Sequence, residues 1–324
     1  MKDTNILNFV NYPYYPYSEW LKTHYGERVY KIPINIGCGC PNRDGVLDDK
    51  GCIFCGESGG SSESLSKKLS VTDQLSKNKS YIGQRYKVKK FIPFFQNYTN
   101  TYLPLKQLKS HLESCLANDV VAIAISTRPD CVTEEQLDFF ETFSSDNHVD
   151  ICIELGLQTA NYHTLKRLNR HHGLGDFIDA SFRIKKRNLQ LCVHTILDLP
   201  WDDFLDVCET AEIISGINAD FVKCHALFIE RKTLLEEMYR SGDVTLLTVE
   251  DYLDRAILFL SYLDENIAVQ RIIGRIPEKD SVVSNWHMGW WKVRDLLIKR
   301  MRKEQVFQGS KRKIKKNTII EKLL

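Results

Sequence analysis

The chain has 324 residues, enough to bury a large core, and this length favours one large domain with an appendage over several small domains. Its hydrophobic fraction of 43% and charged fraction of 27% are typical of a globular protein, and the net charge of +2 predicts no strongly charged partner. The first residues lack the basic and apolar regions of a signal peptide, and no apolar run approaches the roughly 18 residues of a membrane span. We therefore expect a cytoplasmic protein that makes no membrane contact.

From residue 29 onward, short β-branched runs alternate with longer segments of helical periodicity. The runs predict strands at 29–36, 91–95, 120–126, 150–157, 190–197 and 221–228. The periodic segments predict helices at 103–118, 134–143, 176–188 and 204–216. Nearly continuous apolar strands separated by amphipathic helices are typical of parallel strands covered by helices. Six such units favour an α/β fold with a partial (β/α)6 TIM-like barrel, although periodicity alone does not distinguish it from an open sheet.

The alternation stops near residue 230, and we expect a small α+β extension from there on. Its elements are a helix at 249–265, a strand-like run at 268–273, an aromatic segment at 286–291 and a helix at 292–305. The predicted parts of the chain are an N-terminal extension (1–28), the barrel (29–230), a C-terminal domain (231–309) and a basic tail (310–324).

Ten cysteines are too few for a disulfide scaffold of this length, and in the cytosol clustered thiols more often bind metal. Four of them, Cys38, Cys40, Cys52 and Cys55, lie close together directly after the first strand. The last three could hold a four-iron cluster that leaves one iron open to a small chelating substrate. All four could instead close a tetrahedral zinc site, and spacing alone supports both. The context favours the iron–sulfur cluster, because this domain is large enough to fold without a metal.

Polar side chains occur near the carboxyl ends of the later strands. They are Gln96, Asn97 and Thr99, then Ser126, Thr127, Arg128 and Asp130, then Glu154 and Gln158, then His194 and Asp198, and finally Lys223 and His225. Because barrel enzymes carry their chemistry at this end, we expect these residues to line one cavity. For any single residue, a buried hydrogen-bonded pair is an equally good interpretation.

Several motifs occur together in this sequence. They are 40-CPNRDG-45 with 52-CIFC-55, 95-FQNYTNTY-102, 126-STRPDC-131, 154-ELGLQT-159, 167-RLNRHH-172, 270-QRIIGRIPEKD-280 and 308-QGSK-311. In this order they resemble the radical S-adenosylmethionine (radical SAM) superfamily, and within it the bacterial YhcC/YtqA-like family. That family is similar to the radical core of the Elongator catalytic subunit. The resemblance covers most of residues 25–311.

The resemblance implies an enzyme in which Cys40, Cys52 and Cys55 ligate three irons of a [4Fe-4S] cluster. The methionine group of S-adenosylmethionine would chelate the fourth iron. Reduction by a one-electron donor such as ferredoxin or flavodoxin would cleave S-adenosylmethionine to a 5′-deoxyadenosyl radical, which abstracts hydrogen from a substrate. Cys38 is not one of the family's three ligands, so we expect it to pack near the site without binding iron.

The resemblance also implies contacts with S-adenosylmethionine at the strand ends. The expected contacts are Phe54 beside the adenine, Gln96, Asn97 and Thr99 near the methionine amino group, Glu154 and Gln158 near the ribose or carboxylate, and Ser126 and His194. The fifth strand ends in 198-DLPWDD-203, which keeps Pro200 but lacks the two glycines of the family's Gly-Leu-Pro-Gly. The candidates for a catalytic role are Cys131, Lys223 and His225.

Basic residues concentrate at 85–90, at 183–187, and at 299–303 with 311–316. The aromatic residues available for base stacking are Tyr81, Tyr86, Trp286, Trp290 and Trp291. With the Elongator resemblance, this makes transfer RNA a candidate substrate, although solvated helix faces and a tail explain the same charges. The sequence ends without the acetyltransferase domain of the Elongator subunit, so that reaction is not carried over. The alternative function is a zinc-stabilised nucleic-acid-binding protein without radical chemistry.

Overall fold

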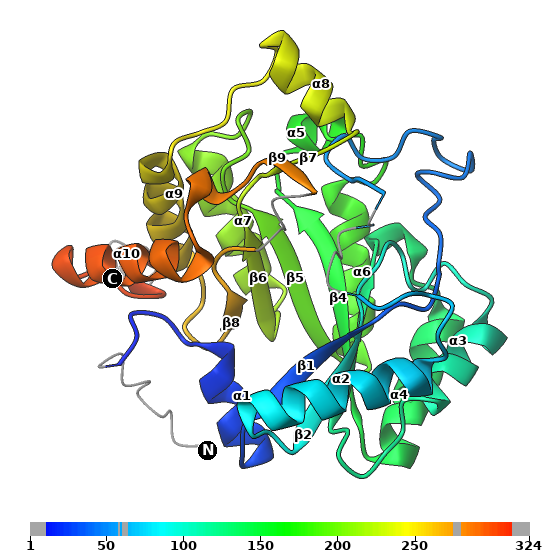
Figure 1. Cartoon of the computed structure of the whole chain (residues 1–324). Helices are drawn as coiled ribbons and strands as arrows, with labels where there is room; N and C mark the ends of the chain where they lie inside the picture. Colours follow the sequence, from blue (N-terminus) through cyan, green and yellow to red (C-terminus); the bar gives the residue numbers. More distant parts are fainter. Residues whose placement is uncertain (1–10, 58, 60–63, 275–279, 313–324) are drawn as a thin grey trace, which may run out of the picture.

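The computed structural model describes residues 11–57, 59, 64–274 and 280–312. Seven parallel strands form one curled sheet, a half-barrel with helices around its outer face (Figure 1). In sheet order the strands are β1 (Val29–Ile34), β2 (Lys90–Phe95), β3 (Ala122–Thr127), β4 (Asp150–Gln158), β5 (Gln190–Ile196), β6 (Phe221–His225) and β8 (Ala268–Arg271). The predicted fold class is confirmed. The strand expected at 268–273 joins the same sheet, because β8 pairs in parallel with β6.

Helices occupy every crossover between neighbouring strands of the half-barrel. They are α2 (Val71–Tyr86), α3 (Leu105–Glu113), α4 (Glu134–Asn147), α5 (Tyr162–Arg167), α6 (Leu174–Lys186), α7 (Phe204–Gly216), α8 (Leu234–Ser241) and α9 (Val249–Tyr262). Six of these eight helices start after a residue whose side chain caps the first turn; for example, the Thr133 side chain accepts the Gln136 backbone N–H, and the Thr248 side chain accepts that of Asp251. None of the described helices is long and apolar enough to cross a membrane.

The two faces of the sheet are both buried, which explains the nearly continuous apolar strands. The outer face packs against the helices through residues such as Ile123 on β3 and Ile153 on β4. The inner face carries smaller side chains at alternate positions, among them Ala124 and Cys152, which belong to a separate cluster. The inside of the half-barrel is therefore filled at one end and can hold a cavity at the other.

The helix α1 (Tyr17–Tyr25), which the sequence did not predict, covers the amino ends of the strands and forms the floor of the half-barrel (Figure 1). The ring of Tyr17 lies edge-on to Phe221, the first residue of β6, at a centroid distance of 4.8 Å. The Tyr25 hydroxyl donates to the carboxylate of Asp150, the first residue of β4, at 2.6 Å. The filled end is thus the amino end, and the open end is the carboxyl end.

The C-terminal part contributes a small antiparallel sheet of β7 (Ile229–Glu230) and β9 (Ser281–Val283), followed by α10 (Trp290–Lys303). Two short 3-10 helices, η1 (Pro129–Cys131) and η2 (Asn285–His287), complete the described elements. Of the predicted basic tail, residues 313–324 lie outside the described residues.

Candidate functional site

A cavity lies at the carboxyl ends of the barrel strands, and both the cysteine loop and the strand ends line it. Three clustered cysteines, Cys40, Cys52 and Cys55, form part of its wall. Eleven further residues predicted from the sequence also line it: Phe54, Gln96, Thr99, Ser126, Thr127, Arg128, Glu154, Gln158, His194, Lys223 and His225. These residues are far apart in the sequence and come together because parallel strands end at one edge of the barrel.

The loop that carries the cysteines is held by hydrogen bonds within itself. The backbone N–H of Cys55 donates to the carbonyl of Cys52 at 3.0 Å, which closes the tight turn of the C-x2-C pair. The backbone N–H of Arg43 donates to the carbonyl of Cys40 at 2.9 Å, and its guanidinium Nη1 donates to the carbonyl of Cys55 at 2.7 Å. Arg43 therefore connects the first cysteine to the last.

The sulfur of Cys52 receives two side-chain N–H groups. Arg170 Nη1 lies 3.3 Å and Asn42 Nδ2 lies 3.4 Å from Sγ. The guanidinium of Arg170 is oriented by the carbonyl of Gly156 at 2.9 Å and by His172 Nε2 at 3.0 Å. Burial, reinforced by Arg170, lowers the pKa of His172 to about 2, so its imidazole is a neutral acceptor. These donors would stabilise negative charge on the Cys52 thiolate.

The fourth clustered cysteine, Cys38, is buried outside the cavity lining. Its thiol donates to the backbone carbonyl of Asn97 at 2.9 Å and lies 3.3 Å from Asn100 Oδ1. Burial raises the pKa of the Cys38 thiol to about 12, which keeps it protonated. Asn97 itself is buried beside this thiol and is not part of the cavity lining, unlike the expectation that it contacts the cofactor.

The catalytic candidate Cys131 also lies outside the cavity lining. It ends the short helix η1, and its Sγ lies 3.8 Å from Asp130 Oδ1. Burial, together with the Asp130 charge, raises the pKa of this thiol to about 12. The chain turns at Pro129 directly after β3, so a residue two positions further on no longer follows the inward alternation of the strand. Cys131 is therefore not a cavity residue.

A buried ion-pair network occupies the middle of the half-barrel. The Glu154 carboxylate accepts the ammonium of Lys31 from β1, lies 3.2 Å from Lys223 Nζ of β6, and is 2.7 Å from His194 Nε2 of β5. Gln270 of β8 accepts from Lys31 Nζ at 3.1 Å. Burial alone would raise the pKa of Glu154, but the two lysines and His194 hold it well below its usual range. The network thus links both edge strands, β1 and β8, across the barrel.

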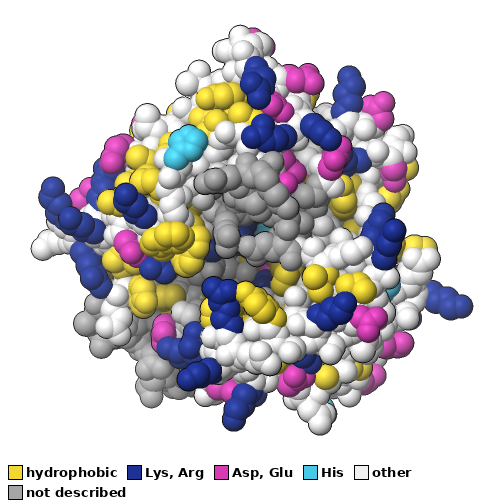
Figure 2. All heavy atoms as spheres, in the orientation of Figure 1, with side chains coloured by type: hydrophobic (Ala, Val, Ile, Leu, Met, Phe, Trp, Pro, Cys, Tyr) yellow, Lys and Arg dark blue, Asp and Glu magenta, His cyan; other side chains and the backbone are white. Residues whose placement is uncertain are grey.

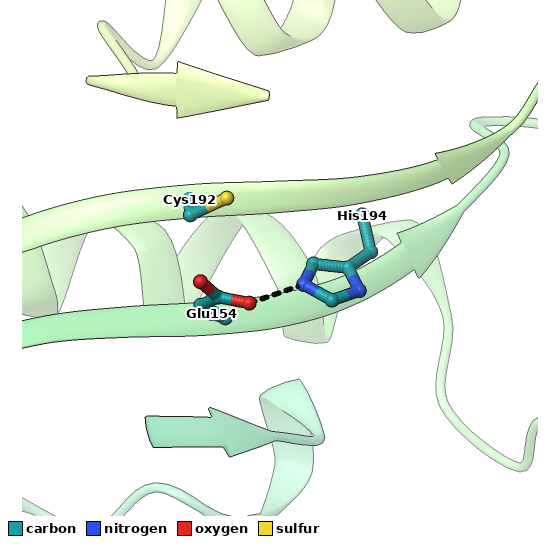
Figure 3. Close-up of side chains that lie close together, drawn as sticks. All are labelled: Glu154, Cys192 and His194. Carbon is teal, nitrogen blue, oxygen red and sulfur yellow. Dashed lines mark hydrogen bonds and ion pairs between the residues drawn. The ribbon is translucent and has the colours of Figure 1, made fainter. Parts of the chain in front are cut away.

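Glu154, Cys192 and His194 bring three potential metal-ligand atoms within 4.8 Å of one another (Figure 3). The close-up shows the His194 ring of β5 turned toward the Glu154 carboxylate of β4, with Cys192 on the same strand as His194. Burial holds the pKa of the Cys192 thiol well above its usual range, and the ammonium groups of Lys31 and Lys223 already neutralise the carboxylate. We interpret this group as part of the ion-pair network, since a cation would have to displace a lysine.

A second group of cationic and imidazole side chains lines the cavity on β6 and β8. Lys223 and Arg271 are partners in the register between these two strands. Arg271 Nη2 lies 2.8 Å from His225 Nδ1, and the His225 ring lies 5.3 Å from that of His194. Burial and the neighbouring Arg271 hold the pKa of His225 well below its usual range, so the imidazole stays neutral.

Sequence reasoning missed Arg170, Lys31 and Arg271. Arg170 belongs to a motif already noted at 167–172, but nothing in the sequence connects it with Cys52, which precedes it by 118 positions. Lys31 lies in the middle of β1, where an ionisable group inside an apolar run is the signal that could have indicated a buried partner. Arg271 could have been predicted as a cavity residue if residues 268–271 had been assigned to the barrel sheet.

None of the described residues of the predicted basic clusters lines the cavity. Residues 85–90 and 183–187 precede the starts of β2 and β5, at the end opposite the cavity, and Arg187 is paired with Glu134 and Asp138. On the face shown in Figure 2, Lys and Arg side chains are interspersed with Asp and Glu, while hydrophobic side chains gather beside the start of α10. Trp290 and Trp291, both exposed, lie at that helix start, with the Arg294 guanidinium 5.2 Å from the Trp290 ring centroid.

Comparison with known proteins extends these observations to related chains. The protein MJ0486 of Methanocaldococcus jannaschii is 33% identical over 305 residues, which cover 93% of this chain and 92% of that protein. YtqA of Bacillus subtilis is 29% identical over 297 residues, covering 91% and 92%. The tRNA uridine(34) acetyltransferase of M. jannaschii is 26% identical over 160 residues, 48% of this chain and 29% of that protein.

The fold is also found in a solved structure, the archaeal Elp3 of Methanocaldococcus infernus with an N-terminal deletion. It superimposes with a TM-score of 0.66 at 17% identity, covering 86% of this chain and 64% of that one. The sequence model of the Radical_SAM C-terminal domain matches residues 219–303, and that of the Radical SAM superfamily matches residues 34–212. The resemblance read from the motifs is thus confirmed, and the chain belongs to the Radical SAM superfamily.

Proposed function

We propose that this protein is a radical SAM enzyme in which Cys40, Cys52 and Cys55 hold a [4Fe-4S] cluster at the mouth of the half-barrel. The observation that carries the proposal is the convergence of these three thiols with the barrel strand ends on one cavity. When bound, the cluster and S-adenosylmethionine supply one-electron cleavage to methionine and a 5′-deoxyadenosyl radical. The chain's own residues hold the cluster, orient the cofactor and exclude water.

The surroundings of the cysteines fit an iron–sulfur cluster better than the alternative zinc site. Thiolates around a tetrahedral zinc lie within about 4 Å of one another, given zinc–sulfur bonds of about 2.3 Å. Among the described residues, the only group of three potential ligands within 4.8 Å is the one containing Glu154, so no three cysteine sulfurs lie that close to one another. The Arg170 and Asn42 donors at Cys52 Sγ match the hydrogen bonds that tune cluster thiolates.

The predicted cofactor contacts can be divided by their surroundings. Phe54, Gln96, Thr99, Ser126 and Gln158 line the cavity with the cysteines, so these five residues are proposed to contact S-adenosylmethionine. Glu154 and His194 also line it, but they are bonded to each other at 2.7 Å. We assign these two chiefly to orienting the barrel interior.

The test is 5′-deoxyadenosine formation by the full chain, reconstituted anaerobically with iron and sulfide and reduced with dithionite. We expect a brown protein that forms deoxyadenosine, and Cys40→Ala, Cys52→Ala and Cys55→Ala variants that lose both the colour and the product. Cys38→Ala is the matched control, because it removes a nearby thiol outside the cavity and should retain both. A colourless protein holding one zinc, unfolded by Cys40→Ala, would instead support the zinc alternative.

We propose transfer RNA as the substrate of this radical chemistry. Two observations support it: the partial match to tRNA uridine(34) acetyltransferase, and the exposed Trp290 and Trp291 beside Arg294 on α10. The clusters at 85–90 and 183–187 do not contribute, since they precede strands at the far end of the barrel. The assay is deoxyadenosine formation with and without bulk transfer RNA. Added RNA should increase turnover, and no change would contradict this choice of substrate.

A further inference from the structure

The ion-pair network inside the half-barrel contains more positive than negative charge. Two ammonium groups, those of Lys31 and Lys223, share the single carboxylate of Glu154, one on each oxygen. His194 adds no charge, because burial, reinforced by Lys223, lowers its pKa to about 4. Counted over these four side chains, two positive charges and one negative charge leave a net charge of +1. The Glu154 side chain has no solvent exposure and that of Lys223 is 8% exposed.

The excess charge is located at the cavity wall. Lys223 lines the cavity, whereas Lys31 is not among the lining residues and pairs with the other carboxylate oxygen of Glu154. Arg271, the register partner of Lys223 on β8, lines the same wall. Two cationic side chains on adjacent strands therefore line one space, which they share with the buried carboxylate of Glu230 and with Cys40, Cys52 and Cys55.

A purely structural ion pair does not need the second lysine. Burying a charge without a matching countercharge costs free energy, and Lys31 with His194 would already satisfy Glu154. The ring of Phe94 lowers part of this cost, since both ammonium nitrogens lie over it, Lys31 at 4.3 Å and Lys223 at 4.2 Å from the centroid. A buried excess charge held ready at a cavity wall is what an anionic ligand requires.

We propose that Lys223 and Arg271 form an oxyanion-binding subsite that receives a carboxylate or phosphate group of the substrate. The assignment deepens the proposed function and rests on it, because the subsite then holds the substrate in the cavity where the radical is generated. Lys223 supplies a point charge, and the planar guanidinium of Arg271 can donate two parallel hydrogen bonds to two oxygens. His225, 2.8 Å from Arg271 Nη2, restrains the guanidinium.

Anion binding by the reconstituted full chain tests the subsite without any turnover. The probes are inorganic phosphate and sodium acetate, titrated at constant ionic strength with chloride replacing each anion, and the readout is the thermal unfolding midpoint. We expect a saturable rise with at least one probe, and the probe that binds more tightly identifies phosphate or carboxylate as the group. Lys223→Gln and Arg271→Gln should each weaken this binding about tenfold, as the loss of one charge-assisted hydrogen bond does.

The matched control is Lys232→Gln, which removes a lysine whose side chain is 77% exposed, and it should bind the probes as the wild type does. Lys223→Gln should unfold no more readily than the wild type, because Glu154 keeps Lys31 and His194. If neither anion shows saturable binding, or if both cavity variants bind as the wild type does, the subsite does not exist.

S-adenosylmethionine also carries a carboxylate, so the titrations are repeated with it present. Unchanged anion binding supports a substrate subsite. Competition between the probes and S-adenosylmethionine, with weaker cofactor binding in both variants, would overturn the assignment in favour of the cofactor. Failure of the proposed function is seen separately, as absence of deoxyadenosine from a protein that still binds the anions.

Discussion

The three thiols proposed to hold the cluster, those of Cys40, Cys52 and Cys55, have different surroundings. Of these three, and among the described residues, Cys52 is the thiol that receives side-chain N–H groups, from Arg170 and Asn42. Hydrogen bonds and positive charge near a cluster sulfur stabilise the reduced state, which carries one more electron, and so raise the reduction potential. The Gly156 carbonyl orients Arg170 for this contact by accepting from Nη2 at 2.9 Å. A side chain at position 156 would crowd this arrangement, because an added Cβ would lie 3.1 Å from Arg170 Nη2 and 2.9 Å from Gln158 Nε2.

We predict that Arg170→Met lowers the reduction potential of the reconstituted cluster, because it removes both a charge and a hydrogen bond at Cys52. Arg170→Lys should fall between this variant and the wild type. The measurement is a redox titration followed by electron paramagnetic resonance. Arg167→Gln, which removes an exposed arginine three positions earlier, is the control and should leave the potential unchanged. Equal potentials for Arg170→Met and the wild type would show that the contact does not tune the cluster.

Asp198, at the end of β5, is fully buried and its carboxylate accepts the Leu227 N–H at 2.6 Å. Burial raises its pKa to about 7. An unfolded aspartate has a pKa near 3.9, so the folded protein binds this proton more tightly than the unfolded chain. The stability it contributes is fully present below about pH 4 and is lost as the pH rises through about 7.

Asp198→Asn cannot ionise but retains an oxygen for the Leu227 N–H. Between pH 5 and pH 8 we predict that the free energy of unfolding of the wild type falls by up to about 3 kcal/mol more than that of the variant. Urea denaturation at several pH values measures both slopes. Parallel slopes would mean that the carboxyl group is already ionised in the folded protein at pH 5.

At the scale of elements, helix α1 closes the half-barrel at the amino ends of its strands. Its buried residues Tyr17 and Leu21 belong to one cluster with inner-face side chains of six strands, including Phe94 and Phe221. An apolar floor of this kind keeps water from reaching the Glu154 network from below. Water there would screen the attraction between Glu154 and its lysines.

We predict that Tyr17→Ala lowers the free energy of unfolding by about 3 kcal/mol, because it removes a buried ring and leaves a cavity against Phe221. Ser18→Ala, an exposed substitution on the next residue, is the control and should change stability little. Urea denaturation followed by circular dichroism gives both values. If Tyr17→Ala costs no more than Ser18→Ala, α1 is not packed as described.

The elements that could be predicted share one property, burial on both faces or a clear amphipathic stripe. Strands β1 to β6 and helices α4 and α7 have it. Helix α2, whose 16 residues bury Val71, Gln74, Leu75 and Ile82, has a comparable stripe but was not predicted. Helix α1 buries aromatic side chains against a surface that exists only after the barrel has formed. Its position depends on long-range packing that sequence periodicity does not encode.

The site residues, too, divide into those whose position local sequence patterns predict and those whose position depends on long-range packing. Side chains on the strands could be predicted because alternation fixes the direction in which they point, which is why Glu154, His194 and Lys223 all line the cavity. Beyond a strand end, alternation no longer applies, and Asn97 and Cys131 lie elsewhere. Arg170 approaches Cys52 from a loop, so its contact depends on how α5 and the following turn pack.

At the scale of the whole molecule, segments from both halves of the sequence meet at the edge of the half-barrel. The Gln308 side chain accepts the Tyr15 N–H at 2.9 Å and donates to the carbonyls of Asp264 and Ile267, just before β8. The Tyr15 carbonyl in turn accepts the Val269 N–H at 2.8 Å. The motif at 308–311 therefore connects the segment before α1 to the last strand of the sheet.

This connection has a consequence for the order of events during synthesis. Residues 15–25 leave the ribosome long before their partners on β8 and at Gln308 are made. We therefore expect the N-terminal segment to dock after β1 to β6 have assembled, as one of the last steps of folding. Until then Phe94, Phe221 and the buried charges above them are open to water from below. Residues made early thus complete the fold late, and a chain interrupted before residue 308 would lack the Gln308 contacts that hold Tyr15.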